Sequence, residues 1–314
     1  MLDFFRRLKA TYMMYNFFQK DALVHNVALY RKYGVKKKYF STVSSKDFKH
    51  LPASSLIANT SSRIKETTLF KNQDANNQES MLGYDQKGYL ILRNYLSEDK
   101  VDTLNQSIDQ LIESGQVSFK YGKKIMFAIH LLPMLASIGY EQQLQELLNV
   151  LIDGEAKLFQ SINFIMGSEQ KTHSDSFHMT TYPLGGLLGV WLALDDIDES
   201  NGPLHYYPGS HLLPYYLNSD YDNEGNYFMI GKKTYKAYEA MIAKKIVQQG
   251  LKKEIFKAKK GDLLIWHANL FHGGEPHLDK TKTRKSVVFH FFKKDSICYH
   301  EITQRPTLMK KFQK

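Results

Sequence analysis

The stretch GDLLIWHANLFHGG, residues 261–274, contains a turn, a short apolar run and two histidines. Gly261 and Asp262 form the turn, and Leu263–His267 has the length and composition of a strand. From Phe159 onward, short apolar runs alternate with turn residues, which predicts a mainly β fold, a sandwich or barrel, with flanking helices. The predicted strands are Ser161–Met166, His173–Tyr182, Gly189–Leu194, Leu204–Tyr207, Leu263–His267 and Ser286–Phe292.

The chain before Phe159 has mostly helical patterns. A strand is expected from Tyr89. Ser97 is a suitable N-cap for a helix whose apolar residues recur at helical spacing up to Ile112. A second helical region is expected over Ile125–Phe159.

A polar stretch, Asn59–Ser80, is rich in Asn, Ser, Thr and Gln and is typical of a loop or linker. We therefore divide the chain into an N-terminal helical extension with this linker, residues 1–80, and a second domain, residues 81–314. The strand-rich core of that domain is expected over residues 160–295.

The composition indicates which cellular compartment and which kinds of partner to expect. The chain has 314 residues, 43% of them hydrophobic, and a formal net charge of +10, which favours anionic partners. No motif of a nucleic-acid-binding fold is present, so a small anionic substrate is expected rather than nucleic acid. Cys298 is the single cysteine, which excludes internal disulfides, Cys-based zinc sites and iron–sulfur clusters and agrees with a reducing cytoplasm. The longest apolar tract, Ile125–Tyr140, is too short to span a bilayer.

The first twenty residues mix aromatic and basic side chains. Such a basic amphipathic helix could lie on an anionic membrane. Alternatively, its aromatic face packs on the rest of the protein or on a second subunit, which is the more common arrangement.

A metal site is suggested by His173-Ser174-Asp175. Residues i and i+2 of a strand point the same way, so this triplet can direct an imidazole and a carboxylate to one point. Two histidines and one carboxylate on one face of an iron ion leave positions open for co-substrate and oxygen. The triplet alone is weak, because His277-Leu278-Asp279 repeats it in a stretch with Pro and charges that is typical of an exposed loop.

The third ligand should come from a strand that is distant in sequence. His272 is favoured because the two glycines after it let the backbone approach a bound ligand. His267 remains an alternative, either as the ligand or as a core histidine.

Arg284 begins the strand that contains Ser286, and alternation puts both side chains on one face. A planar guanidinium makes the bidentate, charge-assisted pair that a buried dicarboxylate requires. Without the histidines, Arg284 would be interpreted as a surface residue in a Lys-rich turn.

Several of these segments form an ordered set: His173-Ser174-Asp175, Gly189–Asp196, Asn201–Leu204, Pro208–His211, Gly261-Asp262, His272–Gly274 and Arg284. Over residues 81–295 this set resembles the phytanoyl-CoA dioxygenase family of iron(II)- and 2-oxoglutarate-dependent oxygenases. The resemblance implies a double-stranded β-helix, or jelly roll, with iron(II) held by His173, Asp175 and His272. It further implies 2-oxoglutarate held by Arg284 and Ser286 beside Trp191, O2 as co-substrate, and a structural role for His211.

The implied reaction decarboxylates 2-oxoglutarate to succinate and CO2 and hydroxylates an unactivated carbon of a small molecule, lipid or glycan-type substrate. His178, Tyr182 and Tyr206 are candidates for the substrate cavity, although aromatic residues at strand spacing are more often core residues. The alternatives are a metal- or ligand-binding protein of the same fold without turnover and a zinc hydrolase.

Overall fold

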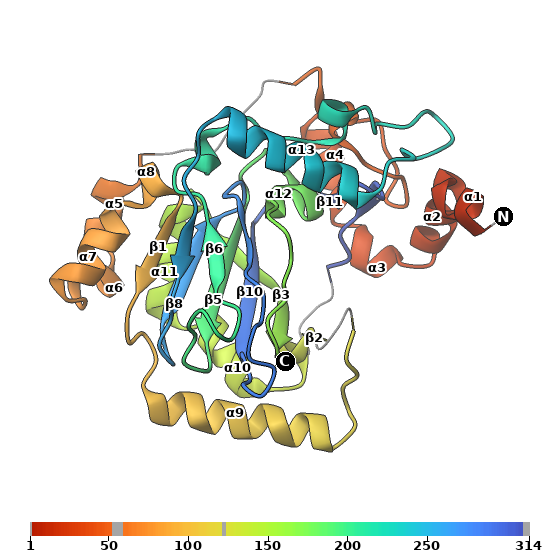
Figure 1. The fold of residues 1–314 in the computed structure, drawn as a ribbon. Coiled ribbons are helices and arrows are strands. Elements are labelled where there is room, and N and C mark those ends of the chain that lie inside the picture. Colours follow the sequence, from red (N-terminus) through yellow and green to blue (C-terminus); the bar gives the residue numbers. More distant parts are fainter. Residues whose placement is uncertain (1, 52–58, 121–123, 310–314) are drawn as a thin grey trace.

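The structure is a computed structural model that describes residues 2–51, 59–120 and 124–309. Its centre is a six-stranded sheet in the order β1-β8-β5-β10-β3-β2, and every pair of neighbouring strands in it is antiparallel (Figure 1). The strands are β1 (Tyr89–Leu92), β8 (Leu263–His267), β5 (Leu187–Ala193), β10 (Ser286–Lys293), β3 (Ala156–Phe164) and β2 (Lys124–Met126).

Two three-stranded sheets complete the β structure. One has the order β7-β6-β9 and the other β12-β11-β4. Their strands are β7 (Glu254–Phe256), β6 (Leu204–Tyr206), β9 (His272–Gly274), β12 (Arg305–Pro306), β11 (Ile297–His300) and β4 (Thr180–Tyr182).

The large sheet faces the β7-β6-β9 sheet across a buried apolar layer. Trp191 and Val288 from the large sheet pack there with Leu204 and Phe256 from the small one. Facing sheets with this topology form a jelly roll, and over the described residues they stay separate sheets, with no closed barrel. The predicted fold class, a jelly-roll core with flanking helices and an N-terminal helical extension, is confirmed.

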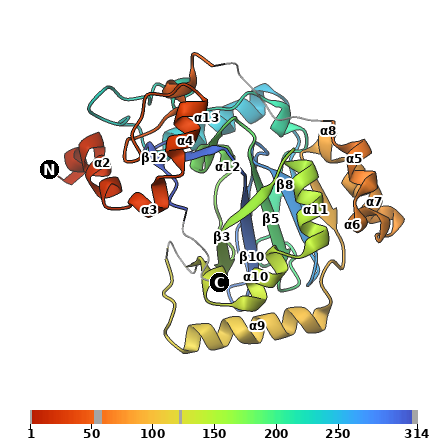
Figure 2. The same cartoon turned by 180° about the vertical axis from the view of Figure 1, so that it is seen from behind.

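Helices cover the outer face of the large sheet, and strand alternation explains why. Val190 of β5 and Phe289 of β10 point to the helices. Their neighbours in the sequence, Trp191 and Val288, point to the opposite face, toward the small sheet. Figure 2 shows α10 and α11 over this face, and α9 crosses one end of the sheet. The helices are α9 (Glu98–Glu113), α10 (Pro133–Gly139) and α11 (Gln142–Leu151).

Three segments differ from their predicted structure. Residues 59–80 are helical rather than a loop, because their few apolar side chains, including Ile64, enter the core beneath α11. The region predicted as helical from Ile125 begins and ends in strands β2 and β3. The predicted strand His173–Tyr182 is divided between a bridge at its start, a short helix and β4. The helices of residues 59–80 are α5 (Ser61–Glu66), α6 (Thr68–Lys71) and α7 (Ala75–Leu82).

An N-terminal lobe, residues 2–51, packs against the β12-β11-β4 sheet. Tyr30 and Phe48 of the lobe form a core with Tyr182 and Tyr299 of the sheet. Figures 1 and 2 show that α1 and α2 project away from the sheets. No described helix has the length and apolar character that spanning a bilayer requires. The helices of the lobe are α1 (Leu2–Arg7), α2 (Lys9–Phe17), α3 (Lys20–Leu23) and α4 (Asn26–Lys32).

Glu301 joins this lobe to the rest of the protein. Its buried carboxylate accepts hydrogen bonds from Ser45 N (3.1 Å), Ser45 Oγ (2.6 Å) and Asn218 N (3.3 Å). We expect Glu301→Ala to lower the free energy of unfolding by about 2 kcal/mol, because two backbone N–H groups lose their partner. Urea unfolding measures this change, and Glu66→Ala, at an exposed position of α5, should leave the stability unchanged. Equal stability of the two variants would contradict this role of Glu301.

Candidate metal centre

Two chain segments, residues 173–175 and strand β9, bring His173, Asp175 and His272 together. The backbones of His173 and His272 pair as an antiparallel bridge, with two N–H···O bonds of 2.9 Å. Asp175 is the first residue of the short helix α12 (Asp175–His178), and Ser174 before it is its N-cap. Ser174 is extended (φ −116°, ψ 136°), so the side chains on either side of it point the same way even though Asp175 is not in a strand.

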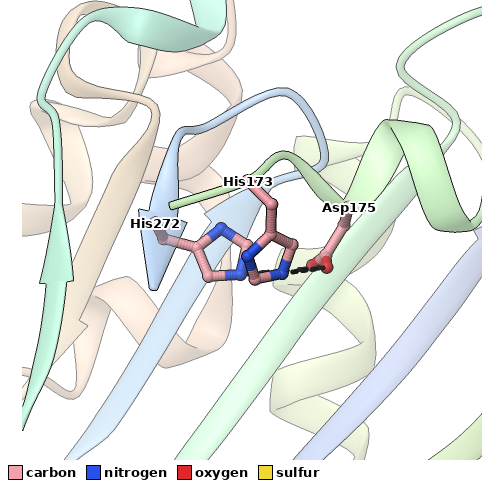
Figure 3. A group of neighbouring side chains, drawn as sticks. All are labelled: His173, Asp175 and His272. Carbon is pink, nitrogen blue, oxygen red and sulfur yellow. Dashed lines mark ion pairs between the residues drawn. The ribbon is translucent and has the colours of Figure 1, made fainter. Parts of the chain in front are cut away.

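The three side chains converge on one point (Figure 3). Asp175 Oδ1 lies 3.7 Å from His173 Nε2 and 3.8 Å from His272 Nε2. The three ligand atoms lie within 4.8 Å of one another, and all three residues are buried. Two imidazoles and one carboxylate in this arrangement can hold a divalent metal ion on one face and leave its other positions open.

Backbone carbonyls select the imidazole tautomers. His173 Nδ1 lies 2.9 Å from Lys171 O, and His272 Nδ1 lies 3.0 Å from Leu270 O. Each Nδ1 therefore carries the proton and donates it, which leaves the Nε2 lone pairs directed at Asp175. Burial lowers the pKa of His173 well below its usual value, so this ring is neutral.

The Asp175 carboxylate is held in its ionised form. Burial alone would raise its pKa, but His272, His290 and His173 and a hydrogen bond from Trp266 outweigh burial and lower the pKa to about 2. An ionised carboxylate beside neutral imidazoles is the protonation state that binds metal.

Trp266 orients this carboxylate. Its Nε1 donates a 2.8 Å hydrogen bond to Asp175 Oδ2, which leaves Oδ1 facing the histidines. The indole occupies space that a glycine provides, because a Cβ at Gly189 would lie 2.3 Å from the Trp266 ring.

We expect Trp266→Phe to weaken iron(II) binding by about 10- to 100-fold, because a carboxylate that loses its outer hydrogen bond no longer has a fixed orientation. Anaerobic iron titration measures the affinity. Tyr89→Phe is a matched control, since Tyr89 pairs with Trp266 across β1 and β8 and its hydroxyl binds Glu254 instead. An unchanged affinity in Trp266→Phe would contradict this role.

A cavity of about 90 Å³ joins the three ligands to Arg284. The guanidinium is buried, and it donates from Nη1 to Ser286 Oγ (2.8 Å) and from Nε to Gly202 O (3.2 Å). Its Nη2 has no hydrogen-bond partner among the described residues. Burial lowers the Arg284 pKa to about 10, so it is still cationic at neutral pH. Trp191 also lines the cavity, with its ring 5.0 Å from the guanidinium carbon.

Further residues that we did not predict also line the cavity, and Lys124, Gln170 and His290 are among them. His290 Nε2 lies 3.8 Å from Asp175 Oδ2, and alternation along β10 from Arg284 through Ser286 could have indicated it. Lys124 had no such signal, because its segment was predicted to adjoin a helix. Gln170 Nε2 lies 3.2 Å from His173 Nε2, on the open side of the ligand.

Of the three residues predicted to line the substrate cavity, only His178 has its ring beside that of a metal ligand. His178 is on α12, with its ring 5.6 Å from that of His173, and its buried Nε2 lacks a hydrogen-bond partner among the described residues. Tyr182 instead stacks on Phe48 of the N-terminal lobe at 4.3 Å. Tyr206 packs on Tyr89 at 4.3 Å within the apolar layer. Neither tyrosine lines the cavity that contains the three ligands.

The other histidines considered from the sequence lie outside the ligand group. His267 Nδ1 accepts a hydrogen bond from Asn269 N, and His211 Nε2 bonds to Asp85 O. His277 is buried rather than exposed as expected, and its Nε2 lies 3.0 Å from Asp279 O.

The sequence is similar to that of proteins of known families. Residues 140–286 match the family model described as phytanoyl-CoA dioxygenase (PhyH). This part of the chain is therefore similar to the phytanoyl-CoA dioxygenase family. Phytanoyl-CoA dioxygenase domain-containing protein 1 of Danio rerio is 25% identical over 182 residues, which cover 40% of this chain and 62% of that protein. Its homolog from Dictyostelium discoideum is 23% identical and covers 71% of this chain and 94% of that protein.

The share of each relative that the chain covers differs among the curated relatives. The chain covers 59–63% of the length of the relatives from Danio rerio, Caenorhabditis briggsae and Bos taurus. The ectoine dioxygenase of Bordetella parapertussis is 22% identical and covers 65% of this chain and 72% of that protein.

Solved structures share the fold. The non-haem, α-ketoglutarate-dependent carbocyclase SnoK from nogalamycin biosynthesis superposes with a TM-score of 0.59 at 16% identity, over 73% of this chain and 87% of that one. EctD from S. alaskensis with 2-oxoglutarate and 5-hydroxyectoine superposes with a TM-score of 0.51 at 18% identity, over 71% and 79%. The chain thus shares its jelly-roll fold with these solved structures.

Proposed function

We propose that this chain is a non-haem iron(II)- and 2-oxoglutarate-dependent dioxygenase that hydroxylates an unactivated carbon. The observation that carries the proposal is a buried arginine with a free N–H group in the same cavity as two histidines and an aspartate. A site of two histidines and one aspartate could also hold a metal ion for other reactions. The buried guanidinium of Arg284 in the same cavity favours a dicarboxylate co-substrate, because a carboxylate can pair with it.

The residues of the cavity fit both iron(II) and 2-oxoglutarate. His173, Asp175 and His272 would hold iron(II), with Trp266 fixing the carboxylate. Arg284 Nη2 would donate to the distal carboxylate of 2-oxoglutarate. When bound, iron(II) and 2-oxoglutarate supply the oxidation of a C–H bond by O2, with release of succinate and CO2.

The cavity walls position this co-substrate. Arg284 sits between Ser286, which accepts from Nη1, and Gly202, whose carbonyl accepts from Nε, so only Nη2 remains directed to a ligand. Ser286 keeps its own hydroxyl hydrogen for a second bond to the carboxylate. Trp191 flanks the guanidinium and excludes water, which strengthens a buried charge pair.

Lys124 provides a second cation in the same cavity. Burial lowers its pKa, and its Nζ lies 5.2 Å from the centre of the Phe164 ring. Two cations in one small cavity match a ligand with two carboxylates.

The substrate side is proposed to lie around His178, beyond the open face of the ligands. The ring of Tyr235, at the start of α13 (Tyr235–Gln248), lies 4.7 Å from the His178 ring. Relatives act on different compounds, since one is named ectoine dioxygenase and the structure of SnoN contains nogalamycin RO. A small molecule, lipid or glycan-type substrate follows by analogy.

The proposed catalytic domain is residues 81–314, preceded by residues 1–80 as an extension. The proposed compartment is the cytoplasm. A single buried cysteine, Cys298, supports a reducing environment.

The test is succinate formation from 2-oxoglutarate by protein that is loaded with iron(II) anaerobically and then exposed to O2. We expect iron-dependent succinate and, before O2 is added, an absorption band when 2-oxoglutarate chelates the iron. Absence of both the succinate and the band would overturn the proposal.

A further inference from the structure

Most of the net positive charge of the chain lies in its first forty residues. Residues 1–40 contain nine Lys and Arg against two Asp, a net charge of +7, whereas the whole chain of 314 residues carries +10. A segment of this charge attracts anionic surfaces over distances of about a Debye length, roughly 8 Å at physiological salt. The exposed basic residues among them are Arg6, Lys20, Arg31, Lys32, Lys36 and Lys38.

Large apolar side chains on the same lobe point into solvent. Phe4 and Phe5 of α1 are 55% and 52% exposed, and at the far end of α2 Phe17 and Phe18 are 54% and 76% exposed. Phe17 contacts Phe40 within the lobe, with ring centroids 5.6 Å apart, but more than half of each of the four side chains is exposed in the single chain. Exposed aromatic groups of this size next to basic residues mark an interaction surface.

A second segment extends this surface. The turn at Tyr227 and Phe228, 86% and 70% exposed, is joined to the start of the chain by backbone hydrogen bonds. Lys9 N donates to Phe228 O (2.9 Å), and Ile230 N donates to Arg7 O (2.9 Å). Four aromatic rings from two distant parts of the sequence thus flank one short backbone ladder. We call Phe4, Phe5, Tyr227 and Phe228 the aromatic surface.

We propose that the N-terminal lobe binds the surface of an anionic lipid bilayer through the aromatic surface and the exposed basic residues of the lobe. Aromatic rings partition into the headgroup region, and Lys and Arg pair with anionic headgroups. The lobe can reach a flat surface because α1 and α2 project from the body of the protein (Figure 1). Binding is peripheral, since no described helix could span the bilayer. This proposal does not depend on the proposed enzymatic function.

Two other partners fit these features less well. A second copy of the chain would bring two lobes of net charge +7 together, which costs electrostatic energy. Single-stranded nucleic acid is bound in a basic groove with aromatic platforms, whereas Phe4 and Phe228 lie on a projecting helix and an exposed turn.

The test is co-sedimentation of the full-length protein with vesicles of phosphatidylcholine alone or with about one third phosphatidylserine. We expect binding only to the anionic vesicles, with loss at high salt. Phe5→Ser/Phe228→Ser and Arg6→Glu/Lys20→Glu/Lys36→Glu should each reduce the affinity about tenfold or more. All five positions are exposed, so the variants should fold, and thermal unfolding checks this.

Matched control variants distinguish binding through this surface from nonspecific hydrophobic or electrostatic binding. Val247→Ser/Leu278→Ser removes apolar side chains that are 80% and 71% exposed elsewhere, and Lys65→Glu/Lys100→Glu/Lys252→Glu reverses three exposed charges outside the lobe. Both controls should bind like the wild type. The proposal is overturned if the protein ignores anionic vesicles, or if lobe and control variants bind alike. It is also overturned if the lobe variants abolish only self-association or only binding of an oligonucleotide.

Discussion

Asp175→Ala is expected to abolish iron-dependent succinate formation, with a loss of about 1,000-fold or more. Removing a residue that only hydrogen-bonds a metal ligand costs about 10- to 100-fold in metal affinity or activity. The loss expected here is larger, because the ligand itself is removed. Asp175 is also the residue that both histidines face, at 3.7 and 3.8 Å. Its removal therefore leaves the two imidazoles without a charged ligand beside them. Succinate assays and bound iron per protein chain measure the two effects.

The chain contains its own control for this experiment. Asp279 ends the second His-X-Asp triplet, but it lies outside the ligand group, and its carboxylate accepts hydrogen bonds from Thr281 rather than facing a histidine. Asp279→Ala should keep both iron and activity. If Asp175→Ala retained iron and formed succinate at the wild-type rate, the assignment of the metal centre would be wrong.

Arg284→Met has the second largest expected effect, on the co-substrate rather than on the metal. We expect the KM for 2-oxoglutarate to rise by about 30- to 1,000-fold, the cost of removing one partner from a buried charge pair. Iron content should not change, because Arg284 does not belong to the ligand group. Methionine has a similar length without charge, so the fold should tolerate it in the buried site.

Arg284→Lys separates charge from geometry. Lysine keeps the cation but lacks the planar fork, so it should restore only part of the affinity for 2-oxoglutarate. Arg63→Met, which removes an arginine of α5 that pairs with Asp153 outside the cavity, should leave the KM unchanged. A wild-type KM in Arg284→Met would show that the dicarboxylate is bound elsewhere.

The predictions from sequence succeeded where a short-range pattern was sufficient. The period of two along the segment that leads into β10 predicted that Arg284 and Ser286 lie on one face, and the helical spacing after Ser97 predicted α9. They failed where tertiary packing decides the outcome. Residues 59–80 are polar enough to be interpreted as a linker, yet Ile64 and a few other apolar side chains meet a core that only the folded protein provides.

The sequence by itself determined which residues are available for chemistry: a His-X-Asp triplet, a second histidine stretch and an arginine that begins a strand. Only the tertiary structure decided which of them meet. His272 rather than His267 faces Asp175 because the bridge between residues 173 and 272 fixes the register, and Lys124 reaches the cavity only through β2. The physical reason is that a metal site depends on distances of a few ångströms between residues about a hundred positions apart, and such distances are set by how strands pair, not by the order of residues along the chain.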